Sequence, residues 1–290
     1  MSEKKILISG LPGSGKTTFF AALWHLLSEH EVPIALSLSK LPENREYLNK
    51  LSAKWRVHTE VDRTPTDELR EIHLALKNDR GEELELYAPD VSGETWKGLW
   101  TDRSCTTKIA EWSKEACGVM LFLHADNIDA PVDVPTYISM AGGTPQDSGV
   151  TTGWDPTDAP TQVILVDILQ SLSRLPLCNN ARNLVVVISA WDKAAEMGQT
   201  PEQFIEFNLP LLYQYLRCSG DFTQFNIFGV SALGGDPKLP ADSERMKAEN
   251  IPAKRIQVVN SSIELPSKHD LTLPIQWLLE AQVSDEGLEC

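Results

Sequence analysis

Gly10-Leu-Pro-Gly-Ser-Gly-Lys16-Thr17 is the stretch that decides the fold, because a short apolar run precedes it and a helical pattern follows it. The run Ile6-Leu-Ile8 is typical of a buried strand, and the residues from Thr18 to Leu27 suit a helix with a broad buried face. The sequence therefore predicts a strand, a glycine-rich turn and a helix N-terminus. Backbone N–H groups in such a turn bind phosphate oxygens together with the helix dipole.

The side chains of this loop complete a predicted site for a nucleoside triphosphate. A lysine at position 16 reaches the β- and γ-phosphates, and the hydroxyl of Thr17 is a ligand for Mg²⁺. A glycine-rich turn with a coincidental lysine is the alternative, but chance produces the whole pattern in only about one chain in a hundred of this length. The residues expected to contact the phosphates are Gly10, Gly13, Ser14, Gly15, Lys16, Thr17 and Thr18.

Length and composition predict one domain over residues 1–290, with insertions, because 42% of the side chains are apolar. The chain has 26 basic and 41 acidic residues, a formal net charge of −15, which argues against direct binding of nucleic acid. Five cysteines without a C-x-x-C pair indicate a reducing cytoplasm, with no disulfide framework and no structural zinc. Neither a signal peptide nor insertion into a membrane is expected.

Short β-branched runs alternate with helical patterns, which predicts an α/β fold: a doubly wound, mostly parallel sheet covered on both faces. An antiparallel edge hairpin is expected over residues 69–87. Further strands are expected at 118–124, 184–189 and 225–231, and helices at about 104–116, 161–175, 201–217 and 271–282. Residues 33–58 look largely helical and then irregular. Two polar stretches, 126–160 and 234–268, are interpreted as long irregular insertions.

The motifs resemble those of Ras-like GTPases of the translation-factor-related class in order and approximate spacing. After the phosphate loop come Asp90-x-x-Gly93 at the end of the hairpin, Asp192 after an apolar strand, and Val230-Ser231-Ala232. Three further details look most like the bacterial double-GTPase group, which is associated with multi-gene conflict or defence systems. These details are Arg63-Thr64, Gly93-Glu94 and Pro274-Ile-Gln-Trp-Leu-Leu279.

The resemblance implies roles around the γ-phosphate. Asp90 would hold Mg²⁺ through a water, and the N–H of Gly93 would approach the γ-phosphate. Either Thr64 or Thr66 would be the metal-binding threonine of the first switch segment. Arg63 precedes Thr66 by three residues, the spacing of an intrinsic arginine finger in G-protein α subunits; a solvated loop arginine is the alternative. Two tryptophans beside this loop, Trp96 and Trp100, either relay its release to a partner or pack as core.

Base recognition is where the sequence departs from its relatives. The family reads guanine with Asn/Thr-Lys-x-Asp, whereas this chain has Ser189-Ala190-Trp191-Asp192. Asp192 keeps the carboxylate that accepts two hydrogen bonds from guanine, so GTP and GDP are expected in preference to adenine nucleotides. The lysine that covers the base is absent, and Lys193 and Trp191 are the two candidates to replace it. Ser231-Ala232 resembles the loop whose alanine N–H binds the guanine O6.

Two functions from different classes remain open. The first is a GTPase switch, in which GTP and Mg²⁺ order residues 60–67 and 90–103 for a protein partner. Glu94 stands where the family often has a water-orienting Gln, which predicts slow hydrolysis until a partner or self-association supplies an arginine. The second is a pseudo-GTPase that binds nucleotide without hydrolysing it. A small-molecule kinase fits less well, since residues 126–160 contain no Arg or Lys for a lid.

Overall fold

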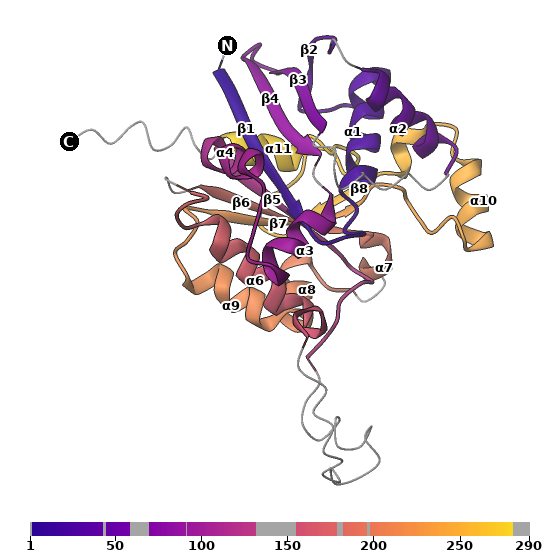
Figure 1. Ribbon diagram of the computed structural model, residues 1–290. Helices are drawn as coiled ribbons and strands as arrows, with labels where there is room; N and C mark the ends of the chain where they lie inside the picture. Colours follow the sequence, from indigo (N-terminus) through magenta and orange to yellow (C-terminus); the bar gives the residue numbers. More distant parts are fainter. Residues whose placement is uncertain are drawn as a thin grey trace, which may run out of the picture.

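The computed structural model describes residues 2–42, 45–58, 70–90, 92–131, 155–178, 182–195 and 198–280 (Figure 1). The strands are β1 (Ser2–Gly10), β2 (Leu36–Lys40), β3 (Arg70–Asn78), β4 (Glu83–Asp90), β5 (Gly118–His124), β6 (Asn183–Ser189), β7 (Phe225–Ser231) and β8 (Gln257–Asn260). The helices are α1 (Lys16–Glu29), α2 (Glu46–Arg56), α3 (Gly93–Thr101), α4 (Thr107–Glu115), η1 (Pro156–Asp158), α6 (Thr161–Leu172), α7 (Trp191–Ala195), α8 (Pro201–Asn208), α9 (Pro210–Cys218), α10 (Pro240–Ala248), η2 (Pro252–Arg255) and α11 (Leu273–Glu280).

Within these ranges the strands form one eight-stranded sheet in the order β2-β3-β4-β1-β5-β6-β7-β8. The central strands β4, β1, β5, β6 and β7 run parallel. At one edge β3 is antiparallel to both β4 and β2, and at the other edge β8 is antiparallel to β7. From β1 the chain adds strands first on one side and then on the other, so the predicted doubly wound sheet with its edge hairpin is confirmed. Such a sheet binds ligands at the carboxyl ends of its strands, where the winding reverses.

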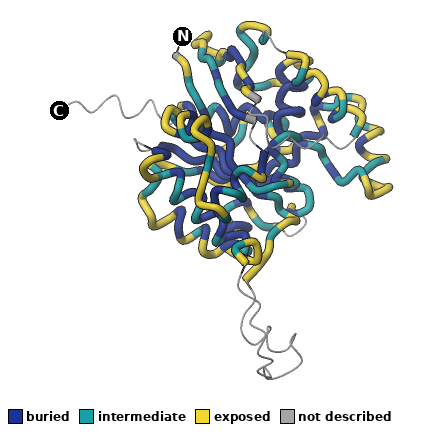
Figure 2. Tube along the Cα trace, in the orientation of Figure 1, coloured by how far each residue is buried: buried dark blue, intermediate teal, exposed yellow. Residues whose placement is uncertain are grey.

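Two hydrophobic cores lie on opposite faces of the sheet. Helices α1, α2 and α11 cover one face, and α3, α4, α6, α8 and α9 cover the other. The sequence of β5 is apolar throughout because both of its faces are buried. Met120 and Phe122 enter the first core, whereas Val119 and Leu121 enter the second. Strands β5, β6 and β7 are accordingly buried along almost their whole lengths, and exposed residues lie on the outer helices, the loops and the edge strands (Figure 2).

Two predictions about secondary structure were wrong, and one helix was missed. Residues 33–58 are not largely helical from the start, because β2 precedes α2 and pairs with β3. The expected helix over 201–217 is two helices, α8 and α9, since Pro210 has no N–H to continue the first and instead begins the second. Helix α3 was not anticipated, because its nine residues are few for a periodic pattern.

The stretch 234–268, interpreted as irregular, carries α10, η2 and the edge strand β8. Strand β8 is only four residues long and buries Val258 while exposing Val259, which is too short an alternation to recognise in sequence. Most of the other predicted insertion, residues 132–154, lies outside the described residues. Among the helices that the structure describes, none has the length and apolar character needed to cross a bilayer.

Candidate functional site

The candidate site lies along one edge of the sheet, where the parallel strands end. Gly10 ends β1, His124 ends β5, Ser189 ends β6 and Ser231 ends β7. Because these strands are parallel neighbours, the loops that follow them emerge side by side. The sequence motifs predicted for phosphate and base binding are therefore brought to a single edge by the topology of the sheet.

The phosphate loop between β1 and α1 has a conformation that only glycine adopts easily. Gly13 and Gly15 have φ angles of 73° and 87°, in the left-handed region. A Cβ on Gly10 would lie 2.4 Å from the carbonyl oxygen of Phe122, and one on Gly15 would lie 2.6 Å from Ser189 Oγ. The loop is thus packed closely on the ends of β5 and β6, and larger residues at positions 10 and 15 would displace it.

Lys16 begins α1 and folds its side chain back over the loop. Its Nζ donates to the carbonyl oxygens of Gly10 at 2.7 Å and Leu11 at 3.1 Å, and to Ser14 Oγ at 3.1 Å. The residue is only 6% exposed, so its charge acts in a poorly solvated environment. The first-turn N–H groups of α1, including those of Thr17 and Thr18, point out of its N-terminus in the manner that suits a bound anion.

These features fit a polyphosphate. Gly10 and Gly15 let the loop backbone pack on the ends of β5 and β6, Lys16 supplies positive charge, and the helix dipole adds to it. Ser189 Oγ, which faces the loop at Gly15, is buried and has no hydrogen-bond partner among the described residues. A buried hydroxyl of this kind is expected to be satisfied by an ordered water or by a bound group.

Gly93 connects the phosphate loop to α3. A Cβ on Gly93 would lie 2.3 Å from the backbone nitrogen of Pro12, so the start of α3 rests directly on the loop. Ser92 caps the helix, its Oγ accepting from the N–H of Glu94 at 3.3 Å. Glu94 is exposed in the first turn. Gly93 therefore lies beside the phosphate loop, as its motif predicts.

The predicted metal ligands are described only in part. Thr17 lies in the first turn of α1, and the backbone of Asp90 ends β4, but the side chain of Asp90 is not described. Residues 59–69, which include Arg63, Thr64 and Thr66, lie outside the described residues. Within the ranges described, no three His, Cys, Asp or Glu side chains gather as a metal site. A hydroxyl and one carboxylate still suit Mg²⁺, which takes few protein ligands when phosphates supply the others.

The base side of the site brings together residues at the ends of three strands, β5, β6 and β7. Ser231 Oγ donates to Asp192 Oδ1, and Gly234 N donates to Ser231 Oγ at 3.2 Å. Lys193 Nζ lies 2.6 Å from Asp126 and 3.5 Å from Asp236. The hydrogen bond between Lys193 and Asp126 raises the pKa of the lysine and lowers that of the carboxylate, so both stay charged at neutral pH. Lys193 thus ties together the loops that follow β5, β6 and β7.

Three tryptophans near the site belong to the core. Trp191 is 2% exposed, packs edge-to-face on Phe204 and fills the space over Gly229, so its proposed role as a base cover is wrong. Trp96 is fully buried, and Trp100 donates through Nε1 to the carbonyl oxygen of Pro156 at 2.7 Å. Of the two interpretations of Trp96 and Trp100, packing as core is the one that the structure confirms.

Other segments support the site with residues that were not among the predicted site residues. The side-chain nitrogen of Asn127 lies 3.9 Å from the position of a Cβ on Gly13. Asp126 has a structural contact with His124, since the N–H of Asp126 donates to His124 Nδ1 at 3.1 Å. The ion pair between Asp126 and Lys193 joins residues far apart in the chain, so no sequence pattern predicts it. Asp236 also pairs with Lys193, and only its position after a strand could have indicated it.

A glycine-rich loop with a buried lysine, set between the first strand and first helix of a doubly wound sheet, defines the P-loop class of nucleotide-binding proteins. Within that class the chain belongs to the Double-GTPase 1 family, whose model matches residues 7–278. Family membership supports GTP binding by this chain. No curated protein matches it.

Several solved structures are similar to this chain at low identity. The Arl6 BBS3 small GTPase of Trypanosoma brucei with bound GppNp is 14% identical over 85% of this chain and 94% of that one, with a TM-score of 0.39. The S. cerevisiae Ski7 GTPase-like domain bound to GDP and inorganic phosphate is 14% identical, with a TM-score of 0.48. That match covers 99% of this chain but 51% of Ski7. The mammalian SRP receptor is also 14% identical, over 84% and 99% of the two chains, with a TM-score of 0.40.

Proposed function

We propose that this protein is a Mg²⁺-dependent molecular switch that binds and hydrolyses GTP. The observation that carries the proposal is the contact of Gly93 with the phosphate loop at Pro12. A γ-phosphate held by this loop would lie beside the beginning of α3, so its loss would be felt there first. Helix α3 would then convey the state of the nucleotide to the surface beyond it.

The chain's own residues have distinct roles in this proposal. Lys16 and the loop N–H groups hold the phosphates, while Thr17, Asp90 and either Thr64 or Thr66 hold Mg²⁺. When bound, Mg²⁺ neutralises charge on the phosphate oxygens. In this proposal the phosphate loop would therefore fix the reacting phosphate group, and the bound Mg²⁺ would stabilise its charge.

On the base side, Asp192 would accept the two donors of the guanine edge, and the N–H of Ala232 would bind O6. The hydrogen bond from Ser231 orients the Asp192 carboxylate. Lys193 is the remaining candidate to cover the base, and its ion pairs with Asp126 and Asp236 hold it among the strand-end loops. This arrangement favours guanine over adenine, since a donor–acceptor mismatch leaves buried polar groups unpaired.

We propose that hydrolysis by the isolated chain is slow. Glu94 carries a charge that a γ-phosphate repels, and a catalytic arginine would come from Arg63, a partner protein or a second copy. Protein partners would read residues 60–67 and 90–103 in the cytoplasm, as part of a multi-protein bacterial system with a role in defence. This wider context rests on resemblance to the double-GTPase group.

A pseudo-GTPase is the second candidate function, and Glu94 is the observation that favours it. In that case GTP would be a structural ligand, and the protein would serve as a nucleotide-binding interaction module.

One experiment tests both functions. Binding of GTP, GDP and ATP analogues is measured by calorimetry with and without Mg²⁺, and phosphate release is then followed over time. Tight, Mg²⁺-dependent GTP binding with slow phosphate release supports the switch. The same binding without any release supports the pseudo-GTPase, and a preference for ATP would refute both.

A further inference from the structure

The loop that follows β7, here called the base loop (residues 231–236), is supported from behind by a tryptophan of α2. Trp55 Nε1 donates to the carbonyl oxygen of Ala232 at 2.8 Å, and the tryptophan side chain is fully buried. This bond joins residues 177 positions apart in the chain. The peptide unit that it restrains directly follows Ala232, whose own N–H is the proposed partner of the guanine O6.

Arg255 of η2 supports the same loop. Its guanidinium carbon lies 4.5 Å from the centre of a Trp55 ring, and the residue is 7% exposed. Its backbone carbonyl oxygen lies 2.7 Å from the position of a Cβ on Gly234, which has a φ of 89°. Burial lowers the pKa of Arg255 to about 10, so the guanidinium remains charged at neutral pH. Trp55 and Arg255 therefore hold each other and two successive parts of the base loop.

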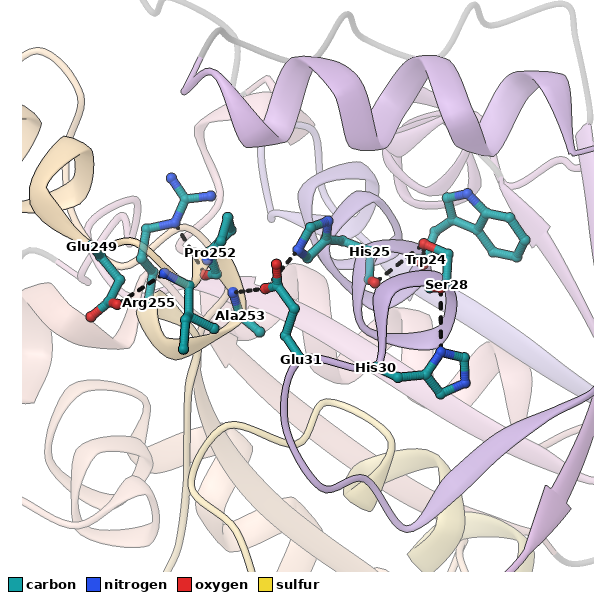
Figure 3. A network of polar contacts seen from close by, with 10 residues as sticks. Trp24, His25, Ser28, His30, Glu31, Glu249, Pro252, Ala253 and Arg255 are labelled. Carbon is teal, nitrogen blue, oxygen red and sulfur yellow. Dashed lines mark hydrogen bonds and ion pairs between the residues drawn. The ribbon is translucent and has the colours of Figure 1, made fainter.

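The helical turn that carries Arg255 is itself attached just beyond the end of α1. The carboxylate of Glu31 accepts from the N–H of Ala253 at 3.0 Å and lies 3.1 Å from His25 Nε2 (Figure 3). Arg255 Nε donates to the carbonyl oxygen of Pro252 at 3.2 Å, which fixes the guanidinium on its own turn. These contacts hold the base loop in a fixed position relative to α1, the helix that begins at the phosphate loop.

We propose that Trp55 and Arg255 are positioning residues that set the base loop for guanine recognition, without touching the nucleotide themselves. This inference rests on the proposed GTP binding and deepens it. If Trp55 releases the Ala232 carbonyl, the peptide that follows Ala232 can rotate, and the adjoining backbone that carries the recognition N–H is no longer fixed. The phosphate loop makes none of these contacts among the described residues, so phosphate binding should not depend on them.

The chain offers a matched control in Trp24 of α1. Trp24 is 3% exposed, and its Nε1 donates to Asn49 Oδ1 at 2.8 Å, so it joins α1 to α2 rather than α2 to the base loop. Trp55→Phe and Trp24→Phe each remove one indole hydrogen bond of a buried tryptophan in the same helical layer. Only the first touches the base loop, which separates a local effect on recognition from a general loss of packing.

The test measures dissociation constants for Mg²⁺-GTP and for Mg²⁺-tripolyphosphate, which has the phosphates but no base. Trp55→Phe should weaken GTP about fivefold, in line with one net hydrogen bond, and change tripolyphosphate less than about twofold. Trp24→Phe should change neither ligand by more than about twofold. Arg255→Lys, which keeps the charge but loses the planar stacking group, should shift GTP in the same direction as Trp55→Phe.

The outcomes distinguish this inference from the proposed function. If the parent protein binds GTP no more tightly than tripolyphosphate, the base is not recognised and both fail. If the parent prefers GTP and both Trp55→Phe and Arg255→Lys retain that preference in full, the proposed function stands and the positioning role is refuted. Equal weakening of GTP and tripolyphosphate in Trp55→Phe would also refute it, because the effect would then be on the whole site.

Discussion

The two halves of the nucleotide site are built in different ways. The phosphate side is a continuous segment, residues 10–17, whose glycines and lysine act within one turn of chain. The base side combines strand ends at Asp126, Lys193 and Asp236 with Trp55 and Arg255 from separate helices. Both halves meet at one edge because parallel strands end together. The phosphate side can be recognised in the sequence because its residues are contiguous. The base side can be recognised only in the structure, because its residues come from separate elements.

This difference also separates what each half tolerates. The phosphate loop is restrained by close packing: a methyl group added to Gly10, Gly15 or Gly93 would lie less than 3.0 Å from a neighbouring atom. The base side is restrained by side-chain hydrogen bonds and ion pairs, which can be lost one at a time. Substitutions should therefore act abruptly on the phosphate side and by degrees on the base side.

The largest effect is expected on the phosphate side, from Lys16→Ala. Removing the ammonium group that lies over the loop should weaken GTP by about a hundredfold or more, because the phosphates lose their nearest buried charge. Calorimetric titration with GTP measures the loss, and circular dichroism checks that the fold persists. Lys50→Ala is the control, since Lys50 is exposed and pairs with Glu46 at 2.6 Å, on α2. A folded Lys16→Ala protein with parental affinity would remove the loop from the site.

Asp192→Asn tests the base side at its proposed recognition group. The amide presents one donor and one acceptor, a pattern that suits xanthine, so GTP should weaken by about 2–4 kcal/mol while XTP improves relative to it. Competition binding with GTP and XTP gives the ratio. Asp126→Asn, which disturbs the ion pair to Lys193 but not the proposed recognition group, should leave the ratio close to parental. An unchanged ratio in Asp192→Asn would place the base elsewhere.

Gly93→Ala tests whether the close contact between α3 and the phosphate loop matters for hydrolysis. A methyl group 2.3 Å from the backbone of Pro12 must push α3 away, so phosphate release should slow by about tenfold and discrimination between GTP and GDP should fall. Gly98→Ala lies in the same helix, where the nearest atom is 3.8 Å away, and it should stabilise α3 by about 0.5–1 kcal/mol. Thermal melts and single-turnover assays on both variants make the comparison. Similar activity in the two would mean that α3 does not report the phosphate.

The same contrast explains how much the sequence could predict. The central strands and the phosphate loop were predictable, because apolar runs and the Lys16 motif are local signals. The position of Gly93 beside the phosphate loop was predictable from the short motif Asp90-x-x-Gly93, because the strand that precedes it, β4, pairs with β1. Strand β8 was missed because four residues are too few for a recognisable alternation, and helix α10 because it is short and polar, with Met246 as its buried residue. Trp55 was missed because its bond to Ala232 spans 177 residues and leaves no pattern at either end.

The smallest effect is expected from Glu94→Gln, which tests how the phosphate side hydrolyses GTP. A carboxylate about 5 Å from a γ-phosphate would be repelled by a few kcal/mol at an effective dielectric near 20, before Mg²⁺ and Lys16 offset the repulsion. Glu94 is exposed in the first turn of α3, where the helix N-terminus favours its negative charge and water is available to it.

Glutamine removes the repulsion and retains a group that can orient water. The basal rate of phosphate release should therefore stay within about threefold of the parent or rise above it. Single-turnover hydrolysis of GTP by the two proteins measures this difference, with Glu111→Gln of α4 as a surface control. Fast turnover by the parent monomer that is lost in Glu94→Gln would contradict the expectation, because Glu94 would then be the general base of a self-sufficient GTPase.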